Sequence, residues 1–211
     1  TGGVSRGRVP ADLVGAPGLT LLEADLLSMD EEELLGQVLG CDAVISCLGH
    51  RASLKGVYGS PRDLVTRAAD TICRQIAAFK PSLPVRLVWM SSVSVNHPDC
   101  SDTRRGAFEK ALLWLIRGVL PPARDNQRAA DFLYREVGAS DPFVEWVAVR
   151  PDTLVEAGVS RYDIHDSLVN GLLAPGRTNM ANVAHFMCEL ATDESVWKTW
   201  KCKLPVIVNA E

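Results

Sequence analysis

The apolar positions of this chain form two kinds of pattern, short continuous runs and longer stretches in which they recur every three or four residues. The continuous runs lie at 19–25, 42–49, 85–95, 143–152 and 204–209. A run that is apolar at almost every position predicts a strand buried on both faces, as in a parallel sheet. The pattern is strongest at 85–95, which has the sequence VRLVWMSSVSV and ends in serines.

Helical periodicity lies between these runs. Residues 28–40 predict a helix that Ser28 caps and Gly40 ends, and its three acidic residues favour the amino terminus. Residues 60–80 predict a second helix, because Ser60 can cap it and Pro61 suits its first position.

Three further helices are predicted at 106–118, 121–138 and 182–193. One face of the first is expected to pack on the sheet, and it carries Phe108, Leu112, Leu115 and Val119. Leu113 and Trp114 turn away from that face, so we expect Trp114 to cover part of a substrate cleft or a partner surface.

Strands and helices alternate along the whole chain, which predicts an α/β fold with a parallel sheet covered by helices on both faces. No internal repeat, low-complexity tract or interdomain linker interrupts the 211 residues. We therefore expect a single domain over 1–211.

The charge and composition of the chain restrict the classes of partner that it is expected to bind. The formal net charge is −4, and no long run of Lys or Arg occurs, which argues against nucleic acid or an anionic membrane as the main partner. The run ALLWLI at 111–116 is far too short to span a bilayer. We expect a monomer or a weak homodimer that binds small molecules.

The six cysteines are scattered and include no CxxC pair. Because Cys47 lies in a strand-like run and Cys73 and Cys188 lie in helix-like ones, we expect buried thiols in a reducing, intracellular compartment. The pairs His97 with Cys100 and His185 with Cys188 lack the further ligands that a zinc site needs, so no metal site is expected.

Three of the predicted strands end in residues that can serve in binding or catalysis: a glycine within 47–50, serine hydroxyls within 90–95 and an Arg-Pro turn within 149–152. Ligands of open parallel sheets bind beyond the carboxyl ends of the strands. Each segment alone is compatible with ordinary turn chemistry, but three such segments at one edge predict a binding site.

Five segments in order resemble successive blocks of one family: LTLLEADL, DAVISCLGH, VRLVWMSSVSV, EWVAVRPDTLVEAG and TNMANVAHFMCEL. The family is the atypical short-chain dehydrogenase/reductase group, in its NAD(P)H-binding branch related to NmrA-like proteins and biliverdin reductase B-like flavin reductases. The resemblance implies a Rossmann-like, doubly wound parallel sheet flanked by helices. It also implies an NADPH-dependent oxidoreductase that transfers a hydride to a small carbonyl, flavin or similar conjugated substrate.

The resemblance assigns roles to positions along the dinucleotide. It places Asp25 and Leu26 beside the adenine, and it runs Leu48, Gly49 and His50 along the ribose and phosphates. For His50, a solvated or phosphate-facing role is favoured over catalysis.

The same resemblance assigns the reactive end. Ser91 and Ser92 match the strand end that faces the nicotinamide, where a serine hydroxyl can hold a substrate carbonyl, so they are the candidate catalytic residues. Arg150, Pro151 and Asp152 match the turn whose backbone packs against the nicotinamide carboxamide.

The chain departs from the family in its catalytic pair. Typical members use Tyr-x-x-x-Lys, in which the lysine lowers the tyrosine pKa. Here Tyr58, Tyr134 and Tyr162 are followed four residues later by Arg, Gly and Asp. Two interpretations stay open: hydride transfer with protons from water or substrate, or a non-catalytic, NmrA-like regulator that senses the dinucleotide.

The opening segment TGGVSRGRV looks like a phosphate-binding turn, but its spacing excludes that. Only about a dozen residues separate Gly7 from the run at 19–25, whereas a helix plus a strand needs roughly thirty. The family pattern places the segment at the end of the second strand, where Arg6, or else Arg8, would reach the adenosine 2′-phosphate. This favours NADP over NAD, although a disordered basic terminus is the alternative.

That placement implies an N-terminally truncated fold, without the first strand, its glycine turn and the first helix. We expect the natural protein to be longer by about forty residues, the size of one β-α-β unit. The loss would separate the second and third family strands from the fourth. We expect a cytoplasmic protein, with an organellar location left open because the N-terminal part of the fold is missing.

Overall fold

A computed structural model describes residues 2–3, 13–22, 24, 29–50, 53 and 57–210. Its helices are α1 (Glu31–Val38), α3 (Leu64–Phe79), α4 (Ala107–Val119), α5 (Pro121–Phe132), α6 (Met180–Thr192) and α7 (Glu194–Trp200). A π-helical turn at Leu133–Val137 continues α5. The strands are β1 (Gly2–Gly3), β2 (Leu21–Leu22), β3 (Ala43–Ser46), β4 (Val85–Met90), β5 (Val144–Pro151), β6 (Thr153–Val155), β7 (Tyr162–His165), β8 (Arg177–Asn179) and β9 (Val206–Asn209).

The central sheet has the strand order β3-β4-β5-β9-β7. β3, β4, β5 and β9 run parallel, and β7 is antiparallel to β9. The predicted α/β fold with a parallel sheet is confirmed. The strands β6, β7 and β8 were not predicted, because the stretch between β5 and α6 is polar and rich in turn residues.

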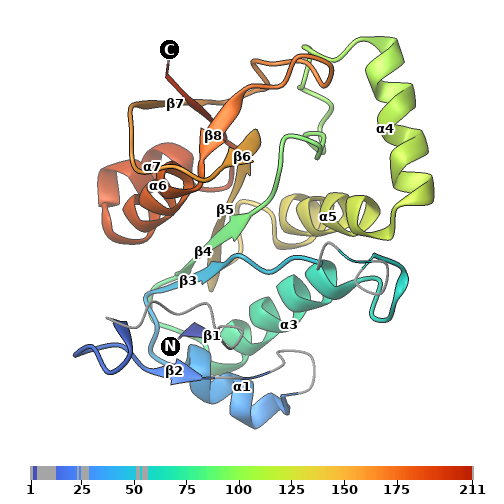
Figure 1. Cartoon of the computed structure of the whole chain (residues 1–211). Helices are drawn as coiled ribbons and strands as arrows, with labels where there is room; N and C mark the ends of the chain where they lie inside the picture. The colour runs from blue at the N-terminus through green and yellow to red at the C-terminus, as the bar shows by residue number, and fades with distance from the viewer. Residues whose placement is uncertain are drawn as a thin grey trace.

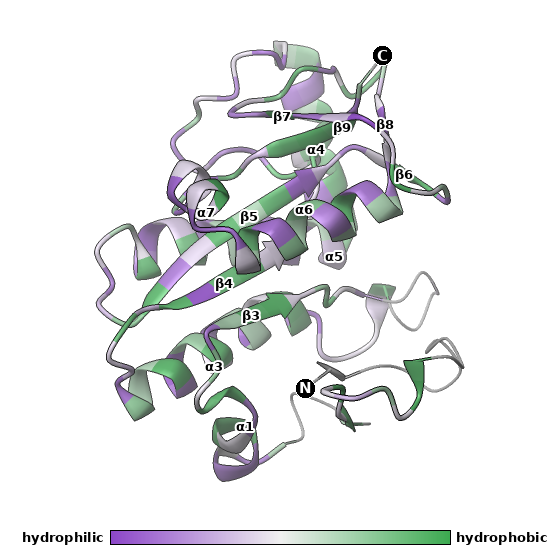
Figure 2. Cartoon of the chain, turned by 90° about the vertical axis from the view of Figure 1, so that its left-hand side faces the viewer, coloured by the Kyte–Doolittle hydropathy of each residue, from purple (hydrophilic) through white to green (hydrophobic). Residues whose placement is uncertain are grey.

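Helices cover both faces of this sheet, and Figure 2 shows α6 and α7 in front of β4 and β5, with α3 and α5 behind. The alternation of side chains along β4 explains the continuous apolar run. Leu87 and Trp89 pack with α3 and α5, whereas Val88 packs with α6 and α7. A strand with both faces buried is therefore apolar at nearly every position, and Arg86 near the start of β4 is the exception.

β1 and β2 form a separate parallel pair, in which Gly2 lies opposite Leu21 (Figure 1). Among the described residues no strand pairs with the outer side of β3, so β3 is an edge strand there. Ile45 on this strand is 44% exposed, whereas apolar residues in the strands of a parallel sheet are usually buried.

Two predicted helix starts are wrong. The cap of α1 is Asp30, whose carboxylate accepts from the Glu33 amide at 2.7 Å, and not Ser28. α3 begins at Leu64, so Ser60 and Pro61 precede the helix and do not cap it. The reason is that the first amides of α3 are bound by a carboxylate from α5, which local sequence does not reveal.

The predicted orientation of α4 is also wrong. Among its residues, all of which the structure describes, Leu113 alone is buried. Phe108 is 68% exposed, Leu115 55% and Val119 56%, so the face expected on the sheet looks toward solvent. Helical periodicity identifies an apolar face, but it does not say whether the protein itself covers that face.

The predicted burial of the cysteines holds for Cys73 and is wrong for Cys47 and Cys188, which are exposed. Cys47 follows the edge strand β3, and Cys188 lies on the solvent side of α6. Burial, with Asp141 and Asp70 nearby, raises the pKa of the Cys73 thiol to about 12.

Alkylation should therefore separate these thiols. At pH 8 a thiol with that pKa is ionised to about one part in 10⁴, so iodoacetamide should modify Cys73 at least about 100-fold more slowly than Cys188. Peptide mapping by mass spectrometry measures both rates, and the difference should vanish in denaturant. Equal rates in the folded protein would contradict the described packing of α3.

Candidate functional site

The carboxyl ends of β3, β4 and β5 meet at one edge of the sheet. The parallel register sets Ser46 opposite Trp89 and Met90 opposite Val149. Beyond the strand end, the Ser91 amide donates to the Val149 carbonyl at 2.7 Å. The Val93 amide donates to the Pro151 carbonyl at 3.1 Å. The segments after β4 and at the end of β5 are therefore in direct contact.

The segment after β3 combines an open backbone with a buried imidazole. A Cβ atom at Gly49 would meet no atom of the described residues within 4 Å, so a ligand can approach the main chain there. Leu48 packs against the larger apolar core. The side chain of His50 is 5% exposed, and its Nε2 lies 2.8 Å from Asp125 Oδ2. His50 is thus held by a carboxylate. Its burial contradicts a solvated role, and the phosphate-facing role stays a prediction.

Asp125 on α5 joins three elements. Its carboxylate, 1% exposed, accepts from the Val65 amide at 2.7 Å and the Thr66 amide at 3.1 Å. It also accepts from the Thr66 hydroxyl at 2.6 Å, in addition to its contact with His50. Asp125 is therefore a buried residue of α5 that caps the amino terminus of a different helix, α3.

The two serines after β4 differ in their partners. Ser92 Oγ accepts from the Ser94 amide at 3.0 Å and lies 2.7 Å from Ser94 Oγ. Ser91 Oγ is buried and has no hydrogen-bond partner among the residues that the structure describes. A buried hydroxyl without a partner is costly and calls for a ligand or water.

Arg150 is fully buried, and its guanidinium faces the protein interior. Its Nη1 lies 2.7 Å from Asp102 Oδ2, and its Nε donates to the Leu204 carbonyl at 2.9 Å. Arg150 Nη2 and Asp102 Oδ1 are buried without a partner among the described residues. The side chain is therefore structural, whereas the neighbouring Pro151 contributes its carbonyl to Val93.

Three arginines hold the loop after β4 by its carbonyls. Arg105 donates to Val93, Arg117 to Ser94 at 2.7 Å, and Arg150 to Val95 at 3.4 Å. Burial lowers the pKa of Arg105 and of Arg117. Since these carbonyls are engaged by side chains, the strand predicted to continue to 95 ends at Met90.

Asp152 anchors the segment that approaches this edge from β8. Its Oδ2 accepts from the Gly176 amide at 2.9 Å and from Asn170 Nδ2 at 3.2 Å. Its own amide donates to Thr178 Oγ1 at 3.2 Å. The predicted Arg-Pro-Asp turn thus organises the loop beside the site.

Four predicted site residues lie outside the described residues: Arg6, Arg8, Asp25 and Leu26. The structure brings together the rest, which are Leu48, Gly49, His50, Ser91, Ser92, Arg150 and Pro151, at the carboxyl edge. Sequence reasoning missed Asp102, Arg105 and Arg117. Charged residues in a turn-rich loop and on a helix give no signal of burial, so only the tertiary fold reveals them.

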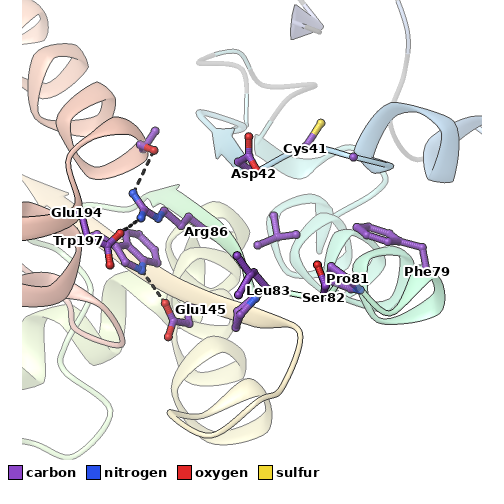
Figure 3. Close-up of a pocket in the computed structure, with 14 residues that line it drawn as sticks. Cys41, Asp42, Phe79, Pro81, Ser82, Leu83, Arg86, Glu145, Glu194 and Trp197 are labelled. Atoms are coloured by element: carbon purple, nitrogen blue, oxygen red, sulfur yellow. Dashed lines mark hydrogen bonds and ion pairs between the residues drawn. The ribbon is translucent and has the colours of Figure 1, made fainter.

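A groove of about 590 Å³ lies at the opposite, amino end of the strands (Figure 3). Its charged groups bind one another: Arg86 pairs with Glu194, and Trp197 Nε1 donates to Glu145 at 2.6 Å. Partial burial would raise the pKa of Glu145, but hydrogen bonds from Lys201 and Trp197 outweigh it and lower the pKa. This groove is distant in the fold from the carboxyl edge, so we do not assign the site to it.

In the part of the chain that the structure describes, no three His, Cys, Asp or Glu residues gather as a metal site. His97 contacts Asp99 through an ion pair, and His185 contacts Tyr162 at 2.7 Å. No helix within the described ranges is long and apolar enough to cross a membrane.

Residues 5–194 match the model of the NAD(P)H-binding family. No curated protein matches the chain. A proposed NADH-flavin reductase from Streptococcus pneumoniae is 13% identical with a TM-score of 0.60, and the match covers 91% of this chain and 81% of that one.

Two further solved structures are similar to the chain. A short-chain dehydrogenase/reductase from Veillonella parvula in complex with NADP is 12% identical with a TM-score of 0.58, over 96% of this chain and 78% of that one. An oxidoreductase from Lactococcus lactis is 19% identical with a TM-score of 0.57, over 91% and 72%. At these identities the likeness shows a common Rossmann-like fold.

Proposed function

The chain belongs to the NAD(P)H-binding family, and from this premise we propose that it is an NADPH-dependent oxidoreductase. Its substrate would be a small carbonyl, flavin or similar conjugated compound that accepts a hydride. The observation that carries the proposal is the carboxyl edge, where Gly49, Ser91 and Ser92 lie on adjacent strand ends. The names of the structural relatives, an NADH-flavin reductase and an NADP-bound reductase, support the reaction class.

The residues of the edge fit the nicotinamide half of the cofactor. The open backbone at Gly49 admits a phosphate or ribose, and the orphaned Ser91 hydroxyl offers a hydrogen bond that nothing described in the protein satisfies. The backbone at Arg150 and Pro151 would pack against the carboxamide. When bound, the reduced nicotinamide supplies the hydride.

Ser92 is the group that we assign to the substrate carbonyl. When Ser94 donates through both its amide and its hydroxyl, Ser92 Oγ accepts two hydrogen bonds. The hydroxyl proton of Ser92 is then available to donate to another group. A hydroxyl that accepts two hydrogen bonds is a stronger donor, because hydrogen bonds in a chain polarise one another. The proton that completes the reduction comes from water or substrate, since the chain has no Tyr-x-x-x-Lys pair.

The phosphate-binding turn is proposed to lie on a strand–turn–helix unit that precedes Thr1 and pairs with the open side of β3. The exposed Ile45 and Cys47 on this edge support the proposal, because the unit would cover them. Arg6 and Arg8 would then select NADP. All six cysteines are free thiols, which is consistent with our proposal of a reducing, cytoplasmic location.

NADPH oxidation by the chain, with and without its upstream coding sequence, tests the function against flavin and quinone acceptors. We expect turnover in the longer protein and a preference for NADPH over NADH that Arg6→Ala abolishes. Binding of NADPH without consumption across the panel would instead support the alternative, a non-catalytic NmrA-like sensor, which the missing Tyr-Lys pair favours.

Ser92→Ala is expected to lower kcat with the best acceptor by about 10- to 100-fold, because one donor to the reacting carbonyl is lost. The KM for NADPH should change little. Ser82→Ala is the matched control, since Ser82 lies in the loop at the opposite end of β4. Steady-state kinetics of the three proteins measure the effect, and equal kcat values would remove Ser92 from the mechanism.

A further inference from the structure

α4 is an amphipathic helix whose apolar side faces outward. On a helical projection at 100° per residue, an uninterrupted apolar arc of roughly 160° carries no charged side chain. Its members are Ala107, Phe108, Ala111, Leu112, Trp114, Leu115, Gly118 and Val119. The largest of them are strongly exposed: Trp114 is 78% exposed and Phe108 68%.

Two charged residues of α4, Arg117 and Glu109, contact the rest of the protein instead. Arg117 donates to the Ser94 carbonyl at 2.7 Å, and Glu109 accepts from the Leu172 amide at 2.7 Å. Leu113, the one buried residue of the helix, lies between them on the helical projection. These contacts fix the rotation of α4, so its apolar arc stays outward. Figure 1 shows the helix at the periphery of the molecule, beyond α5.

The segment that carries this face is rich in basic residues. Residues 103–128 contain six basic and two acidic residues, a net charge of +4 in a chain whose net charge is −4. The charged residues of this segment that are exposed are all basic: Arg104, Lys110, Arg124 and Arg128. The average charge, which argued against an anionic membrane, therefore conceals a local cationic region.

From these observations we propose that α4 docks the protein on an anionic phospholipid surface, with its apolar arc in the headgroup region. A helix with apolar and aromatic residues on one side and basic residues beside them binds such interfaces. A tryptophan at the edge of the arc suits the boundary between headgroups and acyl chains. A second copy is a poorer occupant, because the two cationic regions would repel one another.

Co-sedimentation of the full chain with vesicles tests the proposal. Binding to phosphatidylcholine vesicles that contain phosphatidylserine should exceed binding to phosphatidylcholine alone by about tenfold or more. Raising the salt to about 1 M, where the screening length is about 3 Å, should reduce the difference. Equal binding to both vesicles, or none to either, would overturn the proposal.

Substitutions on α4 test whether this helix causes the vesicle binding. Trp114→Gln with Leu115→Gln should lower binding to the anionic vesicles by about tenfold or more, whereas Leu83→Gln, at an apolar residue 77% exposed before β4, should not. Thermal unfolding of both variants should match the parent protein, because the replaced side chains are exposed. Equal effects of the two changes would contradict a specific face.

Two measurements distinguish insertion of α4 into the lipid surface from a contact between two copies of the chain through the same face. Brominated lipids should quench the fluorescence of the parent protein more than that of Trp114→Phe, although both bind the vesicles. Analytical ultracentrifugation should show the same mass for the parent and for Trp114→Gln with Leu115→Gln. A dimer that the double variant converts to a monomer would show an interface between copies and overturn the proposal.

Discussion

Arg150→Met is expected to lower the free energy of unfolding by about 3–5 kcal/mol, the usual effect of removing one partner from a buried ion pair. The arginine is fully buried, and Asp102 is 5% exposed. Without the guanidinium, the Asp102 carboxylate stays in the interior opposite an apolar side chain. The Val95 and Leu204 carbonyls lose their donor as well.

A double-mutant cycle in urea or guanidinium checks this. Arg150→Met with Asp102→Leu should be less destabilised than the sum of the single changes, because neither charge remains unpaired. The control is Arg74→Met, whose pair with Asp70 is exposed on α3 and should contribute less than about 1 kcal/mol. A loss of that small size for Arg150→Met would contradict the buried pair.

The pair of Arg150 with Asp102 also affects the proposed site. Arg150 is one of three arginines that donate to successive carbonyls of the loop that carries Ser92. A backbone held by side chains from outside its own strand keeps a fixed geometry only while these donors remain. We therefore expect Arg150→Met to reduce kcat at temperatures at which it is still folded, as a positioning effect.

The central sheet was predictable because its strands are buried on both faces, which leaves a continuous apolar run in the sequence. In β4 both Leu87 and Val88 are fully buried, although they point to opposite layers. The carboxyl edge followed from the same reasoning, because parallel strands deliver their ends together. The family resemblance then proposed which of those ends meet the dinucleotide.

What the sequence could not predict depends on contacts between distant residues. Arg150 was expected beside the cofactor through its backbone, but nothing local indicated that its side chain enters the interior toward Asp102. The apolar arc of α4 was expected on the sheet, because periodicity alone does not distinguish a covered face from an open one. The start of α3 depends on a carboxylate 60 residues away from Val65.

Asp125→Ala is expected to lower the free energy of unfolding by about 3 kcal/mol, more than the loss of an ordinary helix cap, which is about 1 kcal/mol. The carboxylate binds two amides and the hydroxyl of Thr66 at the start of α3, and it also contacts His50. Removing it leaves these buried donors without their acceptor. Denaturant unfolding measures the loss, and Asp70→Ala, at an exposed carboxylate on α3, is the matched control.

The contribution of His50 can be separated from that of the cap. If the Asp125 carboxylate acts on both, His50→Ala with Asp125→Ala should be less destabilised than the sum of the single changes, whereas Thr66→Val should cost only about 1 kcal/mol. Additive losses from His50 and Asp125 would mean that the carboxylate serves α3 alone. A coupled loss would mean that one buried carboxylate fixes both the amino terminus of α3 and the imidazole after β3. The stability of the fold and the shape of the proposed dinucleotide edge would then depend on the same residue.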